Sequence, residues 1–80
     1  MFDRTLFKAQ MVIAGVSMDD LARAIGVNES TMYRKLLDDG RFTRNEIVTL
    51  TKVLKIDSLS LVNRIFFGIE HTETKEDDTL

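Results

Sequence analysis

The stretch SMDDLARAIGVNESTMYRKL, residues 17–36, decides how this chain folds. Its pattern of apolar positions separated by polar residues predicts two short helices, 18–25 and 29–37, joined by a tight turn. Gly26 is suited to end the first helix, because glycine adopts the left-handed conformation without a Cβ penalty. Asn28 is suited to cap the second. The apolar positions that set this spacing are Leu21, Ala22, Ile25, Val27 and Met32.

The second of these helices is expected to have two distinct faces. Met32 and Leu36 are four positions apart and fall on an apolar inner side. The polar outer face holds Glu29, Ser30, Thr31, Tyr33 and Arg34. A plain helical hairpin with a merely solvated outer face is the alternative interpretation of the same pattern.

Working outward, the rest of the chain predicts three further helices, and no segment alternates like a strand. Helix 3–14 has two adjacent stripes available for a core, which are Leu6, Gln10 and Ile13, and Phe7, Met11 and Ala14. Helix 44–55 turns Ile47, Leu50 and Leu54 inward. The last helix, capped by Asp57 or Ser58 and ending near Gly68, contributes Leu61, Val62, Ile65 and Phe66. We therefore predict an all-α fold of five helices.

Two helix starts follow the capping-box pattern, in which the cap residue and the third helical residue bond each other's backbone. Ser17 with Asp20 opens the helix at 18, and Thr43 with Glu46 opens the helix at 44. Phe42 is placed to pack against Ile47 as a hydrophobic staple.

The composition limits the function classes. Eighty residues make one domain, with no cysteine and one histidine, so neither a disulfide framework nor a structural zinc site is expected. No glycine-rich phosphate loop and no nucleophile with an ordered base are visible, so we expect no enzyme, no cofactor and no metal. The apolar runs are too short to span a bilayer and no secretory signal is evident, so we expect a cytoplasmic protein.

The charge is unevenly distributed along the chain. Residues 1–69 hold ten lysines and arginines against eight acids, whereas residues 70–80 hold one against five, which gives −2 overall. We expect residues 1–69 to form the folded domain and residues 70–80 to be a disordered acidic tail. That tail either is inert or competes with an anionic partner for arginines. The segment between Arg23 and Arg44 has a modest positive bias.

The chain resembles the bacteriophage repressor and Cro-like family of helix-turn-helix regulators over about residues 6–67. The residues that carry the resemblance are Leu21-Ala22, Ile25-Gly26-Val27, Met32 to Leu36, Phe42-Thr43, Glu46-Ile47 and Leu54. In this family the second helix of the motif enters the major groove and reads base edges. The resemblance therefore implies a sequence-specific duplex-DNA-binding transcriptional regulator.

The resemblance also implies roles for individual residues. Base reading falls to Glu29, Ser30, Thr31, Tyr33 and Arg34, although Glu29 has the alternative role of favouring the positive start of its own helix. Contacts to the DNA backbone fall to Asn28, Lys35, Arg41, Thr43, Arg44 and Asn45. A homodimer on a two-fold operator is expected, with Phe67 and Ile69 as contact residues, core or both.

The chain departs from the family pattern at two positions. Met18 replaces a polar residue that many relatives use to contact a phosphate, so that contact is expected to be lost. Lys35 stands where many relatives bury a hydrophobe, so we expect its stem to pack and its ammonium to reach water or a phosphate, with Leu36 taking the buried role. The overall acidity, the loss of the polar residue at Met18 and the apolar C-terminal stretch support a rival from another class, a protein-interaction module of the same fold that binds a partner regulator or a polymerase subunit.

Overall fold

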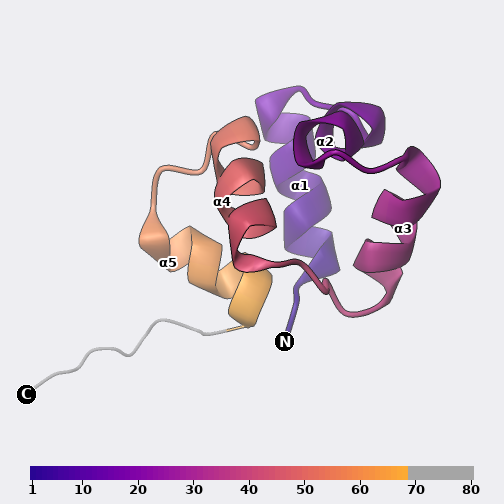
Figure 1. Ribbon diagram of the computed structural model, residues 1–80. Coiled ribbons are helices and arrows are strands. Elements are labelled where there is room, and N and C mark those ends of the chain that lie inside the picture. The colour runs from indigo at the N-terminus through magenta and orange to yellow at the C-terminus, as the bar shows by residue number, and fades with distance from the viewer. Residues whose placement is uncertain (69–80) are drawn as a thin grey trace, which may run out of the picture.

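The computed structural model describes residues 1–68, which form an all-α fold without strands (Figure 1). The helices are α1 (Arg4–Ala14), α2 (Met18–Ile25), α3 (Glu29–Leu37), α4 (Arg44–Val53) and α5 (Leu59–Val62), followed by a π-helical turn, Asn63–Phe67. Within the described part of the chain, the five predicted helices are confirmed.

Helix α2 is the platform of the fold. Helices α3 and α4 both pack against it, and α3 lies at the edge of the molecule on the side away from α5 (Figure 1). Leu21 and Ala22 on α2, Met32 on α3 and Leu50 on α4 are buried together in the core. The inner face predicted for α3 is confirmed, since Met32 and Leu36 are both buried.

Four phenylalanines form an aromatic cluster in the core. The ring centroids of Phe2, Phe7, Phe42 and Phe66 lie 5.4 to 6.3 Å from one another. The chain's beginning is tied to its last helical turn, because the Asp3 amide donates to the carbonyl oxygen of Ile65 at 2.7 Å. This cluster therefore joins elements that are far apart in sequence.

The expected core stripe of α1 was wrong at one position. Ile13 is 75 % exposed, whereas Gln10 is buried and its Nε2 donates to the carbonyl oxygen of Leu54 at 2.9 Å. The core face of α1 is therefore centred on Phe7 and Gln10. A buried amide costs little when it satisfies a backbone acceptor that would otherwise be unpaired.

Helices α1 to α4 end in the same way. In each, an amide bonds a carbonyl five residues back across a residue in the left-handed conformation, which is the Schellman arrangement. Gly26 fills this position after α2, with the Val27 amide donating to Ala22 at 3.0 Å. Lys55 fills it after α4, with φ 57°, so this helix stops at Val53 and not near Lys55 as expected.

The last helix also differs from the single predicted element. It begins at the Ser58 cap, as one of the two expected alternatives, and then widens into the π-helical turn Asn63–Phe67. The carbonyl groups left at this helix end are partly satisfied from outside, since the Met1 ammonium donates to Phe67 at 2.8 Å. The tail, predicted for residues 70–80, lies outside the described residues.

Candidate nucleic-acid interface

The start of α3 is fixed by Asn28. Its side-chain Oδ1 accepts hydrogen bonds from the Thr31 amide at 2.8 Å and from the Ser30 hydroxyl at 2.9 Å. These bonds hold the first turn of the helix and orient the Ser30 side chain. Because this oxygen is committed to the cap, a contact between Asn28 and a phosphate is left to its amide nitrogen.

Four of the five predicted base-reading residues are exposed on α3: Glu29, Ser30, Tyr33 and Arg34. The fifth, Thr31, is half-buried, and its backbone amide is used by the cap. Residues four apart lie on the same side of a helix, so Ser30 and Arg34 form one row and Glu29 and Tyr33 another. The four exposed side chains thus share one face of α3.

The sequence interpretation missed Leu37 on this face. It is 72 % exposed and lies four residues beyond Tyr33, so it extends the row of Glu29 and Tyr33 by an apolar side chain. The spacing of four was the signal that could have identified it. The outer face of α3 is therefore partly apolar along one edge and polar with a cationic arginine along the other.

A second group of predicted contact residues lies beside α3, in the 38–43 connection and at the start of α4. Arg41, Thr43, Arg44 and Asn45 are all exposed. Arg41 Nε lies 3.3 Å from Asp38 Oδ2, in an ion pair open to solvent. The Thr43 hydroxyl accepts from the Glu46 amide at 3.1 Å, and Glu46 Oε1 accepts from the Thr43 amide at 3.0 Å, which confirms the capping box.

Lys35 is placed differently from the expectation. Its side chain is 23 % exposed, and its ammonium lies 3.3 Å from Glu46 Oε1 and 5.8 Å from the centre of the Phe42 ring. The stem packs as expected, but the charge is directed to α4 and not outward. Leu36, next to it, is buried as predicted. The structure therefore separates Lys35 from the outer face of α3.

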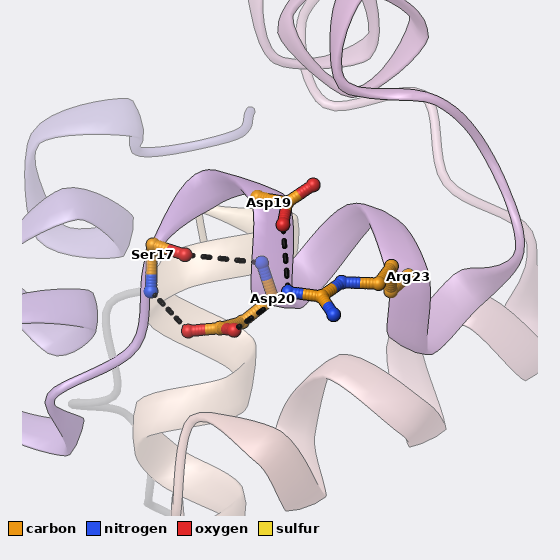
Figure 2. Close-up of polar contacts among 4 residues, drawn as sticks. All are labelled: Ser17, Asp19, Asp20 and Arg23. Atoms are coloured by element: carbon orange, nitrogen blue, oxygen red, sulfur yellow. Dashed lines mark hydrogen bonds and ion pairs between the residues drawn. The ribbon is translucent and has the colours of Figure 1, made fainter.

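The start of α2 is acidic and satisfies its own charges (Figure 2). The Ser17 hydroxyl accepts from the Asp20 amide at 3.1 Å, and Asp20 Oδ2 accepts from the Ser17 amide at 2.8 Å. Arg23 reaches back to Asp19 at 2.7 Å and to Asp20 at 3.6 Å. The positive charge that Arg23 adds to the segment is therefore matched locally.

The surroundings of Asp20 at this end of α2 also affect the pKa of its carboxyl. The bonds from the Ser17 amide and hydroxyl, helped by Arg23, hold the pKa of the Asp20 carboxyl below its ordinary value. Met18, between Ser17 and Asp19, is buried in the core, and the absence of a phosphate contact at this position remains a prediction. A negatively charged partner would meet exposed carboxylates at this helix start.

Of the two predicted dimer residues, Phe67 is 48 % exposed at the end of the π-helical turn. Ile69 lies outside the described residues. Because about half of the Phe67 side chain is accessible to solvent, its role as a dimer contact remains a prediction.

A hollow of about 470 Å³ lies between the chain's beginning and the π-helical turn, and none of the side chains that line it belongs to α3. No three histidine, aspartate or glutamate side chains within residues 1–68 gather into a possible metal site. Among the same residues, no helix combines the length and apolar character needed to cross a membrane.

Comparison of the chain with protein-family models, with characterised proteins and with solved structures gives no match. The resemblance to the repressor and Cro-like family therefore depends on the residues of the sequence alone.

Proposed function

We propose that this protein is a sequence-specific duplex-DNA-binding transcriptional regulator that reads the major groove with α3. The observation that carries the proposal is the outer face of α3, where Ser30 and Arg34 are exposed in one row while Met32 and Leu36 anchor the opposite side. Arginine bonds guanine in a bidentate manner, and serine donates to or accepts from base edges. Helix α3 would supply sequence readout.

The exposed cationic groups beside α3 support a matching role in affinity. Arg41 and Arg44, with Thr43 and Asn45, lie next to one another in the chain at the start of α4. Amides at a helix start and arginine side chains both favour phosphate oxygens. In the proposed complex these residues position the protein on the sugar-phosphate backbone and carry no sequence information.

The proposal extends to assembly and location. Two copies paired through Phe67 and Ile69 would place their α3 helices roughly 34 Å apart, one DNA turn, on a two-fold operator. A regulator of this kind works in the cytoplasm, as a binding protein and not as an enzyme. Sedimentation with and without a two-fold duplex tests the pairing.

Selection of bound sites from a random duplex pool tests the function directly. We expect an enriched motif with two-fold symmetry, and binding that weakens steeply with added salt because phosphate neutralisation supplies most of the affinity. An unenriched pool, with binding that is equal on all sequences, would contradict sequence-specific regulation.

The acidic start of α2 favours one rival, a protein-interaction module that binds a basic partner. Asp19 and Asp20 are exposed where a DNA-binding helix pair would approach phosphates, and Met18 is buried. A mobility-shift series with random duplex at low salt separates the two functions. Since non-specific constants are typically about 10⁻⁴–10⁻⁶ M, the absence of any shift at tens of micromolar protein would favour the rival.

A further inference from the structure

Lys35 and Glu46 form the one ion pair within residues 1–68 that joins two helices. Lys35 Nζ donates to Glu46 Oε1 at 3.3 Å and to the carbonyl oxygen of Arg41 at 3.3 Å. Both side chains are largely covered, with 23 % of Lys35 and 18 % of Glu46 exposed. Partial burial reduces screening by water and salt, so this pair is held more firmly than the exposed pair of Arg41 and Asp38.

The carboxylate of Glu46 has two tasks at once. The oxygen that accepts from Lys35 also accepts from the Thr43 amide at 3.0 Å, which closes the cap of α4. The ammonium of Lys35 also lies over the ring of Phe42, 5.8 Å from its centre. One lysine of α3 therefore holds the end of the connection and the first turn of α4 together.

Direct packing between α3 and α4 does not by itself fix the position of the start of α4. Helices α3 and α4 each pack against α2 and make little direct contact with each other. The connection between them, residues 38–43, contains two successive residues in the left-handed conformation, Asp39 and Gly40. Without a polar link the start of α4 would be set by this turn and by packing alone.

We infer that Lys35 and Glu46 are positioning residues, which fix Arg41 and Arg44 relative to the outer face of α3. This inference rests on the proposed function, in which α3 reads bases while Arg41 and Arg44 contact phosphates. Two groups of contacts to a rigid duplex must hold their spacing to act together. The link supplies that spacing without itself touching DNA.

If Lys35 instead contacts a phosphate directly, Glu46→Gln is expected to change the DNA-binding affinity in the opposite direction. If Lys35 left Glu46 to bind DNA, Glu46→Gln would release the lysine and remove a negative charge near phosphates, so binding would tighten. If the pair positions the arginines, the same variant weakens binding although it removes a negative charge. Glutamine retains an oxygen that can accept from the Thr43 amide, so the cap is kept.

The experiment measures binding of the full chain to its selected duplex, and to a random duplex, over a series of salt concentrations. We expect Glu46→Gln to weaken binding to the selected duplex by about three- to tenfold. Lys35→Met, which keeps an apolar stem, should weaken it similarly and leave the salt dependence unchanged. The double variant should match either single variant, because both remove the same link.

Asp39→Asn is the matched control. It removes one acidic charge from the same connection at a position that asparagine tolerates, with φ 60°, and Asp39 forms no ion pair within residues 1–68. Binding should stay equal or tighten slightly. If Glu46→Gln behaves like Asp39→Asn, or if Lys35→Met reduces the slope of log K against log salt by about 1, the positioning role is overturned.

A second measurement needs no DNA. Amide hydrogen exchange at Phe42, whose amide donates to the carbonyl oxygen of Gly40 within the connection, should accelerate at least several-fold in Glu46→Gln, while exchange at Leu21 and Ala22 in α2 stays unchanged. Equal exchange in the variant and the parent protein would overturn the link even if no duplex is bound. If the parent protein binds no duplex, the proposed function fails separately from this result.

Discussion

Helices α2 and α4 begin with the same local device but use it differently. In both, a hydroxyl and an acid three residues later bond each other's backbone, Ser17 with Asp20 and Thr43 with Glu46. Asp20 is exposed and pairs with Arg23 of its own helix, whereas Glu46 is largely covered and pairs with Lys35 of α3. A capping box therefore becomes a tertiary contact only where neighbouring elements cover its acid.

The difference also separates two electrostatic regions. At α2 the acids and Arg23 compensate one another within a single turn of helix. At α4 the acid is used internally by Lys35, which leaves Arg41 and Arg44 as the exposed charges of that helix start together with Asp38 and Asp39. The start of α2 thus exposes two acids against one arginine, whereas the start of α4 and the connection before it expose two arginines against two acids.

The largest expected effect comes from breaking the support that both regions share. Leu21→Ala on α2 should lower the free energy of unfolding by about 2–5 kcal/mol, because Leu21 is fully buried beneath α3 and α4 and leaves a cavity. Urea denaturation measures the loss. Leu37→Ala is the matched control at an exposed leucine and should change stability by less than about 0.5 kcal/mol. Equal losses would contradict α2 as the platform.

The next largest effect is on the free energy of DNA binding, and it is expected to differ between two arginines, Arg34 and Arg23. Arg34→Ala should cost roughly 1–3 kcal/mol of binding on the selected duplex and little on random duplex, because Arg34 would contact a base. Arg23→Ala should have a much smaller effect, since the charge of Arg23 is already matched by Asp19 and Asp20. Titration of fluorescent duplexes measures both. An equal loss on every sequence would assign Arg34 to phosphate contact.

Removing the two caps tests the comparison itself. Ser17→Ala and Thr43→Ala should each lower the free energy of unfolding by about 0.5–2 kcal/mol. The loss at Thr43 should be the larger, because the orientation of Glu46 toward Lys35 depends on the same box. Thermal unfolding measures both, and Thr43→Ser should restore most of the loss. A larger loss at Ser17 would mean that the link between α3 and α4 adds little.

The smallest effect concerns Asp20 and pH. Bonds from the Ser17 amide lower the pKa of Asp20 most, followed by the Ser17 hydroxyl and Arg23. The unfolded chain therefore binds this proton more readily, so ionised Asp20 stabilises the fold above about pH 4, and this stabilisation is lost as pH falls through the lower folded pKa. Carboxyl NMR titration should give a midpoint below the ordinary aspartate value. Asp20→Asn should flatten the stability profile below about pH 4, and a midpoint at the ordinary value would contradict this.

The helix boundaries and caps were predictable from sequence because they depend on a few adjacent residues. Gly26, Asn28 and both capping boxes lie where the pattern placed them. The predicted end of α4 was two residues too late, because Lys55 adopts a left-handed conformation that ends the helix at Val53, and Ile56 directly after it is buried in the core. On α1 the prediction for Ile13 was wrong, since its side chain is exposed, whereas Gln10 of the same stripe is buried because it finds a backbone acceptor on a distant segment.

For the candidate site, the sequence alone determined which side chains are available on α3, since helical spacing separates Met32 and Leu36 from Ser30 and Arg34. The sequence did not determine the direction in which the charged side chains of α3 point or which groups they contact. Lys35 lies next to Arg34 in the chain, yet one points to Glu46 and the other to solvent. Only the tertiary structure decided this, because the free energy of a charge depends on what covers it and which opposite charge lies within reach, and both come from distant residues.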